Sequence, residues 1–172
     1  MSLTLRMAII NFAGLCVLIW AYSLGYIARV MEGDVAHMAE IMAGLFVLGI
    51  LSAFRLAIRA ERIKGKVDLT TNGRLKAIRS NLIRSEHLVV FSGSLFILSI
   101  IGNALGIKAG FQGIDVQQLA SSEGVLKLGA QVLSGASMTF GSTIIGASLS
   151  IWTTLNAMML HTEMRLLELD AS

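Results

Sequence analysis

Residues 128–160 read LGAQVLSGASMTFGSTIIGASLSIWTTLNAMML, and this stretch decides the fold. Its 33 residues include no Asp, Glu, Lys, Arg or His. About 20 such residues suffice to cross the hydrocarbon core of a bilayer as a helix. At about 1.5 Å per residue the whole stretch would be about 50 Å long. It therefore predicts a membrane helix with one end projecting beyond the bilayer.

Three further apolar segments precede this stretch. Met7–Ile27 has 21 uncharged residues and Leu88–Ile107 has 20, so each is long enough to span a bilayer. Met7–Ile27 is long for the core of a signal peptide, so we expect an uncleaved helix in preference to that alternative. Ile41–Phe54 has only 14 uncharged residues and reaches spanning length when it is extended to about residues 37–58.

These segments predict an all-α integral membrane protein with a single membrane domain over residues 1–172. The composition agrees, because 15% of the residues are charged, against about 25% in a typical soluble domain. The single cysteine excludes an intrachain disulfide. The net charge of +3 does not indicate nucleic acid, since the basic residues concentrate beside apolar segments. The four transmembrane helices are expected at about residues 7–28, 37–58, 88–108 and 128–160.

The basic residues are distributed unevenly among the loops. Residues 55–86 hold nine of the fourteen Lys and Arg residues, residues 30–40 hold none, and residues 108–127 hold two. Positively charged loops stay in the cytoplasm, so we expect residues 55–86 and both termini there. A short cytoplasmic helical hairpin is predicted at 59–86, with its turn at 70–73. Its charge suits anionic lipid or an acidic partner, or serves only to fix the topology.

Small and polar residues recur along the last two apolar segments. Glycine at four-residue spacing lets two helix backbones approach closely in a membrane. Asn103 is an amide in an apolar segment, so it needs a hydrogen-bond partner or a hydrated cavity. On these residues alone, close helix packing is the commoner explanation of the pattern and a wet ion path is the alternative. The predicted packing residues are Gly102, Gly106, Gly110, Gly135 and Gly146, and the polar residues are Asn103, Thr139, Ser142 and Thr143.

Residues 88–107 and 128–160 contain no ionisable side chain. A proton carrier normally needs such a group inside the membrane, so a conducting chain would take its carboxylate from another chain. No nucleophile, phosphate-loop or zinc motif is present, and the three histidines lack metal-ligand spacing. We therefore expect no enzymatic activity, no cofactor and no bound metal.

Residues 135–150, GASMTFGSTIIGASLS, resemble the last transmembrane helix of the MotA/TolQ/ExbB proton-channel family. That helix typically reads G-x-x-x-A-[LF]-x-[TS]-T-x-x-G-L. The preceding family helix reads L-G-x-x-G-T-x-x-G, and residues 98–107, LSIIGNALGI, match both later glycines with Asn103 in place of threonine. Asn156 resembles an asparagine that many members carry further along the last helix. In order, the matches in the last helix are Gly135, Phe140, Ser142, Thr143 and Gly146.

The resemblance, which covers about residues 90–160, implies a function. In this family five copies surround a dimer of a single-span MotB/TolR/ExbD-like partner, and the third and fourth helices line the pore. The partner supplies the aspartate that takes up protons. The resemblance thus implies a homopentameric, ion-driven motor or channel subunit of the bacterial inner membrane, embedded in lipid, with both termini cytoplasmic. It places Asn103, Thr139, Ser142 and Thr143 along the ion path.

Three features depart from the family pattern. Met138 stands where ExbB-like members carry a glutamate, the chain has no proline, and the loop at 55–86 is much shorter than the one that MotA-type stators use to grip a rotor. These features favour a small or divergent member over a flagellar stator. A non-conducting four-helix scaffold subunit is the main alternative. A small solute transporter is weaker, because neither an inverted repeat nor a broken helix is visible.

Overall fold

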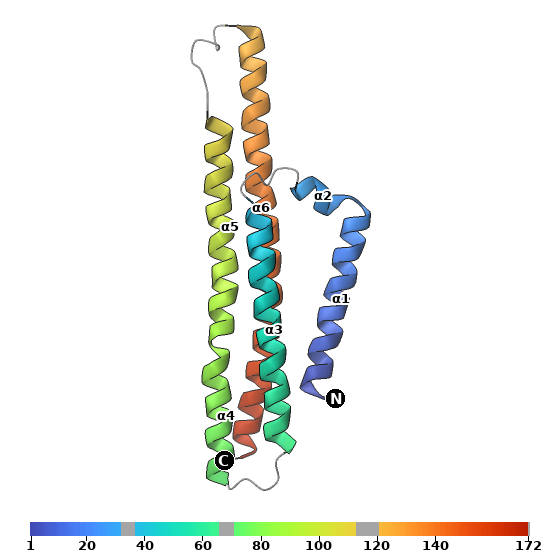
Figure 1. Ribbon diagram of the computed structural model, residues 1–172, viewed down its shortest axis with the longest axis vertical. Coiled ribbons are helices and arrows are strands. Elements are labelled where there is room, and N and C mark those ends of the chain that lie inside the picture. Colours follow the sequence, from blue (N-terminus) through green and yellow to red (C-terminus); the bar gives the residue numbers. More distant parts are fainter. Residues whose placement is uncertain (32–36, 66–70, 113–120, 172) are drawn as a thin grey trace.

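The structure is a computed structural model that describes residues 1–31, 37–65, 71–112 and 121–171, without the side chain of Met138. These residues are helical throughout, apart from short connections and ends, and contain no strand. Within these residues four helical stretches are long and apolar enough to cross a membrane, so the expected all-helical class is confirmed and a multi-pass membrane protein is indicated. The helices, shown in Figure 1, are α1 (Leu3–Ser23), α2 (Tyr26–Met31), α3 (Met38–Gly65), α4 (Thr71–Ser85), α5 (His87–Phe111) and α6 (Ser122–Leu169).

The helices α1, α3, α5 and α6 extend past the expected membrane spans at one or both ends, and two other boundaries also differ from the sequence-based expectation. The first helix ends at Ser23 because Gly25 adopts a φ of 73°, a left-handed conformation that favours glycine. The short helix α2 then turns away from α1 (Figure 1). The turn expected at residues 70–73 is helical from Thr71 onward, and Thr70 lies outside the described residues.

The helices α4 and α5 follow one another with almost no break. Glu86 between them keeps a right-handed helical conformation, with φ −60° and ψ −30°. The two helices thus form one stretch of 41 residues from Thr71 to Phe111. The end of α3 and the start of α4 lie antiparallel at one end of the molecule, next to the end of α6 (Figure 1). We call this the basic end, defined as residues 55–65 of α3, all of α4, and residues 161–171.

The helix α6 has 48 residues and is therefore about 72 Å long. It runs antiparallel to α5, and both extend beyond the start of α3 at the end opposite the basic end (Figure 1). Gly106 lies against Thr139 and Gly110 against Gly135, so Lys108 of α5 is level with α6 residues between these two. The part of the uncharged stretch 128–160 that exceeds the length of a membrane span therefore lies at the end opposite the basic end.

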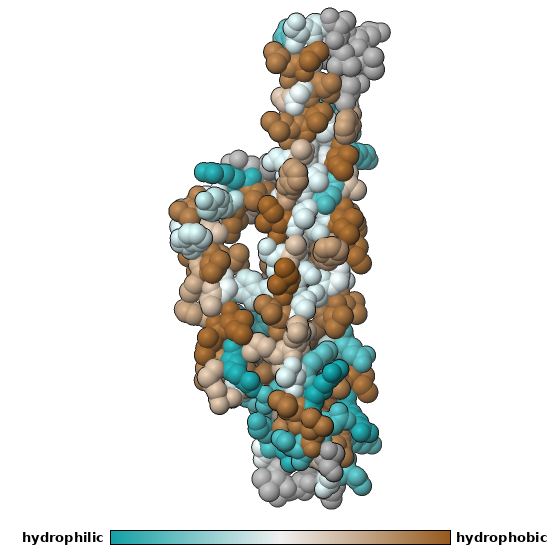
Figure 2. Space-filling view, turned by 180° about the vertical axis from the view of Figure 1, so that it is seen from behind, coloured by the Kyte–Doolittle hydropathy of each residue, from teal (hydrophilic) through white to brown (hydrophobic). Residues whose placement is uncertain are grey.

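Buried apolar side chains gather mainly at the basic end. There Met7 of α1, Ile78 of α4 and Met164 of α6 are fully buried in one core that also takes in α3. Elsewhere large apolar side chains cover the surface, for example Phe12 and Phe140, each 68% exposed. Figure 2 shows the hydrophilic residues concentrated at the basic end and hydrophobic ones over most of the remaining length. This distribution suits a protein that faces lipid along its middle.

Candidate functional site

Glycines bring α5 and α6 into backbone contact over about three turns. A Cβ atom added at Gly102 would lie 2.6 Å from Cβ of Ser142, and one at Gly106 would lie 2.7 Å from the Thr139 hydroxyl. One added at Gly135 would lie 2.5 Å from Cα of Gly110. Real Cβ atoms essentially never approach so closely, so only glycine fits at these positions. The same holds for Gly146, which lies against Ser99 and the Leu95 carbonyl of α5. We call this contact the α5–α6 seam.

Asn103 of α5 inserts its amide among polar atoms of both helices. Its amide nitrogen lies 2.7 Å from the carbonyl oxygen of Thr139 and 3.0 Å from that of Ser99. The same nitrogen lies 2.8 Å from the Ser142 hydroxyl, and the amide oxygen accepts a hydrogen bond from the Thr143 hydroxyl at 3.0 Å. The seam therefore gives Asn103 the partners that an amide needs in an apolar environment. All four polar residues singled out in the sequence meet in this cluster.

Thr143 stands at the outer edge of the Asn103 cluster. Its side chain is exposed, whereas the neighbouring Ser142 is only 8% exposed. Besides the Asn103 amide oxygen, the Thr143 hydroxyl has the carbonyl oxygen of Thr139 at 3.0 Å as an acceptor. A hydroxyl donates one proton at a time and keeps lone pairs for an incoming donor. Thr143 thus presents an exchangeable hydroxyl group at the exposed edge of the Asn103 cluster.

A second hydroxyl cluster lies between the same two helices, closer to the basic end of the molecule. The Ser92 hydroxyl is 2.6 Å from that of Thr154 and 3.0 Å from that of Ser150. Ser150 in turn donates to the Ser92 carbonyl oxygen at 3.0 Å. Ser150 and Thr154 belong to the small and polar residues that recur along the last apolar segment, whereas Ser92 was not singled out in the sequence. Its position seven residues before Ser99, on the same face of α5, was the available signal.

Sequence reasoning missed a polar connection between α1 and α6. Asn11 Oδ1 accepts a hydrogen bond from Trp152 Nε1 at 2.8 Å, and Asn11 Nδ2 donates to Asn156 Oδ1 at 2.6 Å. Asn156 is fully buried. Gly14, one turn after Asn11, lies directly on the Trp152 ring. The signal was present, since Asn11 is the one side-chain amide within Met7–Ile27.

Glu163 of α6 forms a charged junction at the basic end, beyond the uncharged stretch 128–160 that the sequence predicts to span the membrane. Its carboxylate pairs with Arg6 of α1 and, at 3.2 Å, with Lys64 of α3. The side chain is 13% exposed. Burial acts to raise the pKa of Glu163, but the hydrogen bonds from Lys64 and Arg6 outweigh it and hold that pKa below its ordinary value. Glu163 therefore carries its charge at neutral pH.

The described residues contain no group of three His, Cys, Asp or Glu side chains that could hold a metal ion. His87 bonds with Ser52, and His37 with Glu40 at 3.2 Å, so these two histidines have local partners. The chain matches no family model, no curated protein and no solved structure. The α5–α6 seam with its Asn103 cluster is the arrangement that brings the polar residues predicted from the sequence together.

Proposed function

We propose that the protein is a subunit of an ion-driven energy-transducing complex in the bacterial inner membrane. In this proposal five copies surround a dimer of a single-span partner that carries the titrating aspartate. The observation that carries the proposal is the Asn103 cluster, whose Thr143 hydroxyl lies at the exposed edge of the α5–α6 seam. The resemblance of these same residues to the MotA/TolQ/ExbB family supports it.

The chemistry of the cluster suits proton transfer to and from a neighbouring carboxylate. Thr143 and Asn103 supply a hydroxyl and an amide, which can bind water or a carboxylic acid without holding a fixed charge. Neither residues 88–107 nor residues 128–160 contain an ionisable side chain. In this proposal, as the family resemblance implies, the group that takes up the ion belongs to the partner, and this chain supplies the polar wall past which it moves.

The charge distribution sets the proposed orientation. The basic end carries most of the Lys and Arg residues and would face the cytoplasm under the positive-inside rule. The first residues of α1 and the last residues of α6 lie at that end, so both termini would be cytoplasmic (Figure 1). The projecting ends of α5 and α6 would then stand on the opposite side of the membrane.

The copy number of the complex is the first test. We expect native mass spectrometry of the purified complex to give five copies of this chain, and five plus two when a single-span partner with an intramembrane aspartate is co-expressed. A monomer or dimer that ignores the partner would refute the assembly and favour a different function. The adjacent reading frames are the place to find the partner.

The role of Thr143 is tested by two variants that differ in whether they keep the hydroxyl. Thr143→Val removes the hydroxyl, and Thr143→Ser keeps it. We expect Thr143→Val to lower proton flux into proteoliposomes of the complex at least tenfold, and Thr143→Ser to retain most of it. Equal flux in both variants, with assembly unchanged, would exclude Thr143 from the ion path.

The alternative function is that of a non-conducting scaffold subunit, and one observation favours it. The hydroxyls of Ser142, Ser150 and Thr154 all find acceptors within the α5–α6 pair. Polar groups satisfied in this way also serve as helix-packing contacts. In that case both Thr143 variants would assemble normally, and the wild-type complex would show no flux above that of empty vesicles.

A further inference from the structure

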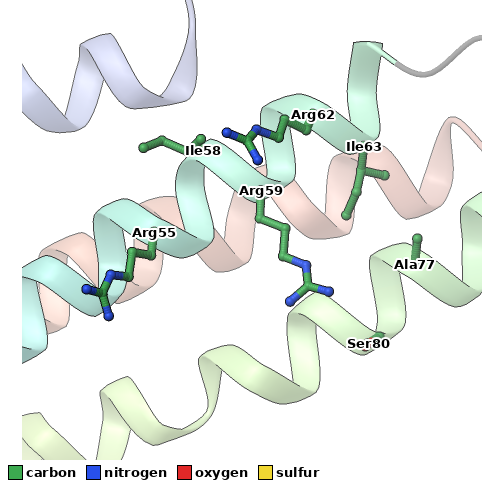
Figure 3. A pocket seen from close by; sticks show the side chains of 7 residues that line it. All are labelled: Arg55, Ile58, Arg59, Arg62, Ile63, Ala77 and Ser80. Carbon is green, nitrogen blue, oxygen red and sulfur yellow. The ribbon is translucent and has the colours of Figure 1, made fainter.

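Arginines of α3 and α4 line an open groove at the basic end, which we call the basic groove. Its larger part has a volume of about 640 Å³ and lies between the second half of α3 and α4. In Figure 3, Arg59 extends from α3 toward α4, and Arg55 lies one turn earlier on the same side. A second part, of about 490 Å³, shares both arginines and adds Arg84 and His87 at the junction of α4 and α5.

The positive charge of the basic groove is not neutralised within the described part of the chain. The ion pairs at this end use Glu163 and Glu168, and none of the four groove arginines takes part in them. Like charges four residues apart on a helix repel each other, and the spacing from Arg55 to Arg59 is of this kind. A bound anion would remove that repulsion. The four groove arginines are Arg55, Arg59, Arg62 and Arg84.

The position of the groove indicates which anion it meets. Arg55 directly follows the uncharged run 41–54 of α3, and His87 directly precedes the run 88–107 of α5. The groove therefore opens at the level where two apolar segments end, which is the level of lipid headgroups. Ile58 and Ile83 stand beside the arginines and are 41% and 66% exposed. The guanidinium groups, which have no ion-pair partners among the described residues, match the phosphate of a phospholipid headgroup, and the apolar surface beside them matches its acyl chains.

We propose that the basic groove binds the phosphate of an anionic phospholipid, with the start of its acyl chains against Ile58 and Ile83. Guanidinium groups hold phosphate oxygens through paired hydrogen bonds, which an ammonium group does not reproduce. The inner leaflet of a bacterial membrane would supply the lipid if the basic end is cytoplasmic. The proposal does not depend on ion transport, because the groove lies at the basic end, away from the Asn103 cluster.

Native mass spectrometry of the purified wild-type protein, titrated with phosphatidylglycerol or with phosphatidylcholine of the same chains, tests the proposal. We expect retained phosphatidylglycerol and little phosphatidylcholine. Arg55→Gln/Arg59→Gln should weaken phosphatidylglycerol binding at least tenfold. The matched control, Lys76→Gln/Arg165→Gln, removes the same charge from exposed positions that do not line the groove, and should change binding less than twofold.

Other outcomes would overturn the proposal. Equal weakening in both double variants would mean diffuse electrostatic attraction without a site. Both lipids carry a phosphate and only phosphatidylglycerol is net negative, so equal retention of the two by the wild type would mean that the groove does not select an anionic lipid. Arg55→Lys/Arg59→Lys keeps the charge in case the Gln variant fails to fold, and should still bind at least threefold more weakly than wild type. Unchanged binding in Ile83→Gln, with free inorganic phosphate displacing the lipid, would identify a phosphate site instead.

Discussion

Two helices, α5 and α1, run antiparallel to α6, and they are held to it in opposite ways (Figure 1). The helix α5 meets α6 along the seam, where glycines allow backbone contact from Gly146 to Gly135. The helix α1 is attached through Asn11, Gly14 and the charged junction at Glu163, and residues 15–20 are all exposed. The attachment of α5 is one continuous, closely packed seam, whereas α1 is held by two buried side chains, Leu3 and Met7, and by a few polar anchors.

The difference reflects what drives helix association in a membrane. Lipid tails are as apolar as leucine, so apolar side chains alone give no preference for helix over lipid. Close backbone contact gains dispersion energy over a long seam, whereas a hydrogen bond fixes one point. We therefore expect α5 and α6 to form the rigid part of the protein, and α1 to be the helix that detaches first when its anchors are removed.

The largest effect is expected from filling the seam. Gly135→Val would place side-chain atoms into the backbone of Gly110 and Gly106, which cannot move aside as a flexible side chain can. We expect a loss of about 3 kcal/mol or more in the free energy of unfolding, at the upper end of overpacking costs. The free energy of unfolding is measured by denaturation with sodium dodecyl sulfate, monitored by circular dichroism. Gly129→Val is the matched control on the same helix, because no described residue beyond the adjacent turns of α6 lies within 4 Å of a Cβ at Gly129.

The seam was largely predictable from the sequence, and the attachment of α1 was not. Residues four apart on a helix lie on one face, so the spacing of Gly102, Gly106 and Gly110 is enough to predict their common face. The anchor at Asn11 joins residues 145 positions apart, Asn11 and Asn156, and no periodicity connects them. The break at Gly25 depends on one backbone angle, which a uniformly apolar pattern does not reveal.

A smaller effect is expected from removing the Asn11 anchor. Asn11→Leu keeps the size of the side chain but leaves the Trp152 N–H without its acceptor and the Asn156 oxygen without its donor. Hydrogen bonds between membrane helices contribute about 0.6 kcal/mol on average, so we expect a loss of about 1–2 kcal/mol. In a Trp20→Phe background, where Trp152 is the remaining tryptophan, Asn11→Leu should also change the Trp152 fluorescence. Phe12→Leu, at an exposed neighbouring position, should change neither quantity; an equal change there would show that α1 is not held by Asn11.

The smallest effect, and the one that depends on pH, concerns Glu163. Because the folded-state pKa of Glu163 is lowered, its stabilising contribution is present above the unfolded value of about 4.5 and is lost as the pH falls through the folded value. We expect Glu163→Gln to cost about 1 kcal/mol at pH 7, since both cationic partners are substantially exposed and screened. The difference in unfolding free energy between wild type and variant should shrink below about pH 4.5 and in high salt. A difference that stayed constant over this range would mean that Glu163 holds α1 by packing and not by charge. The junction at Glu163 would then no longer count among the polar anchors of α1.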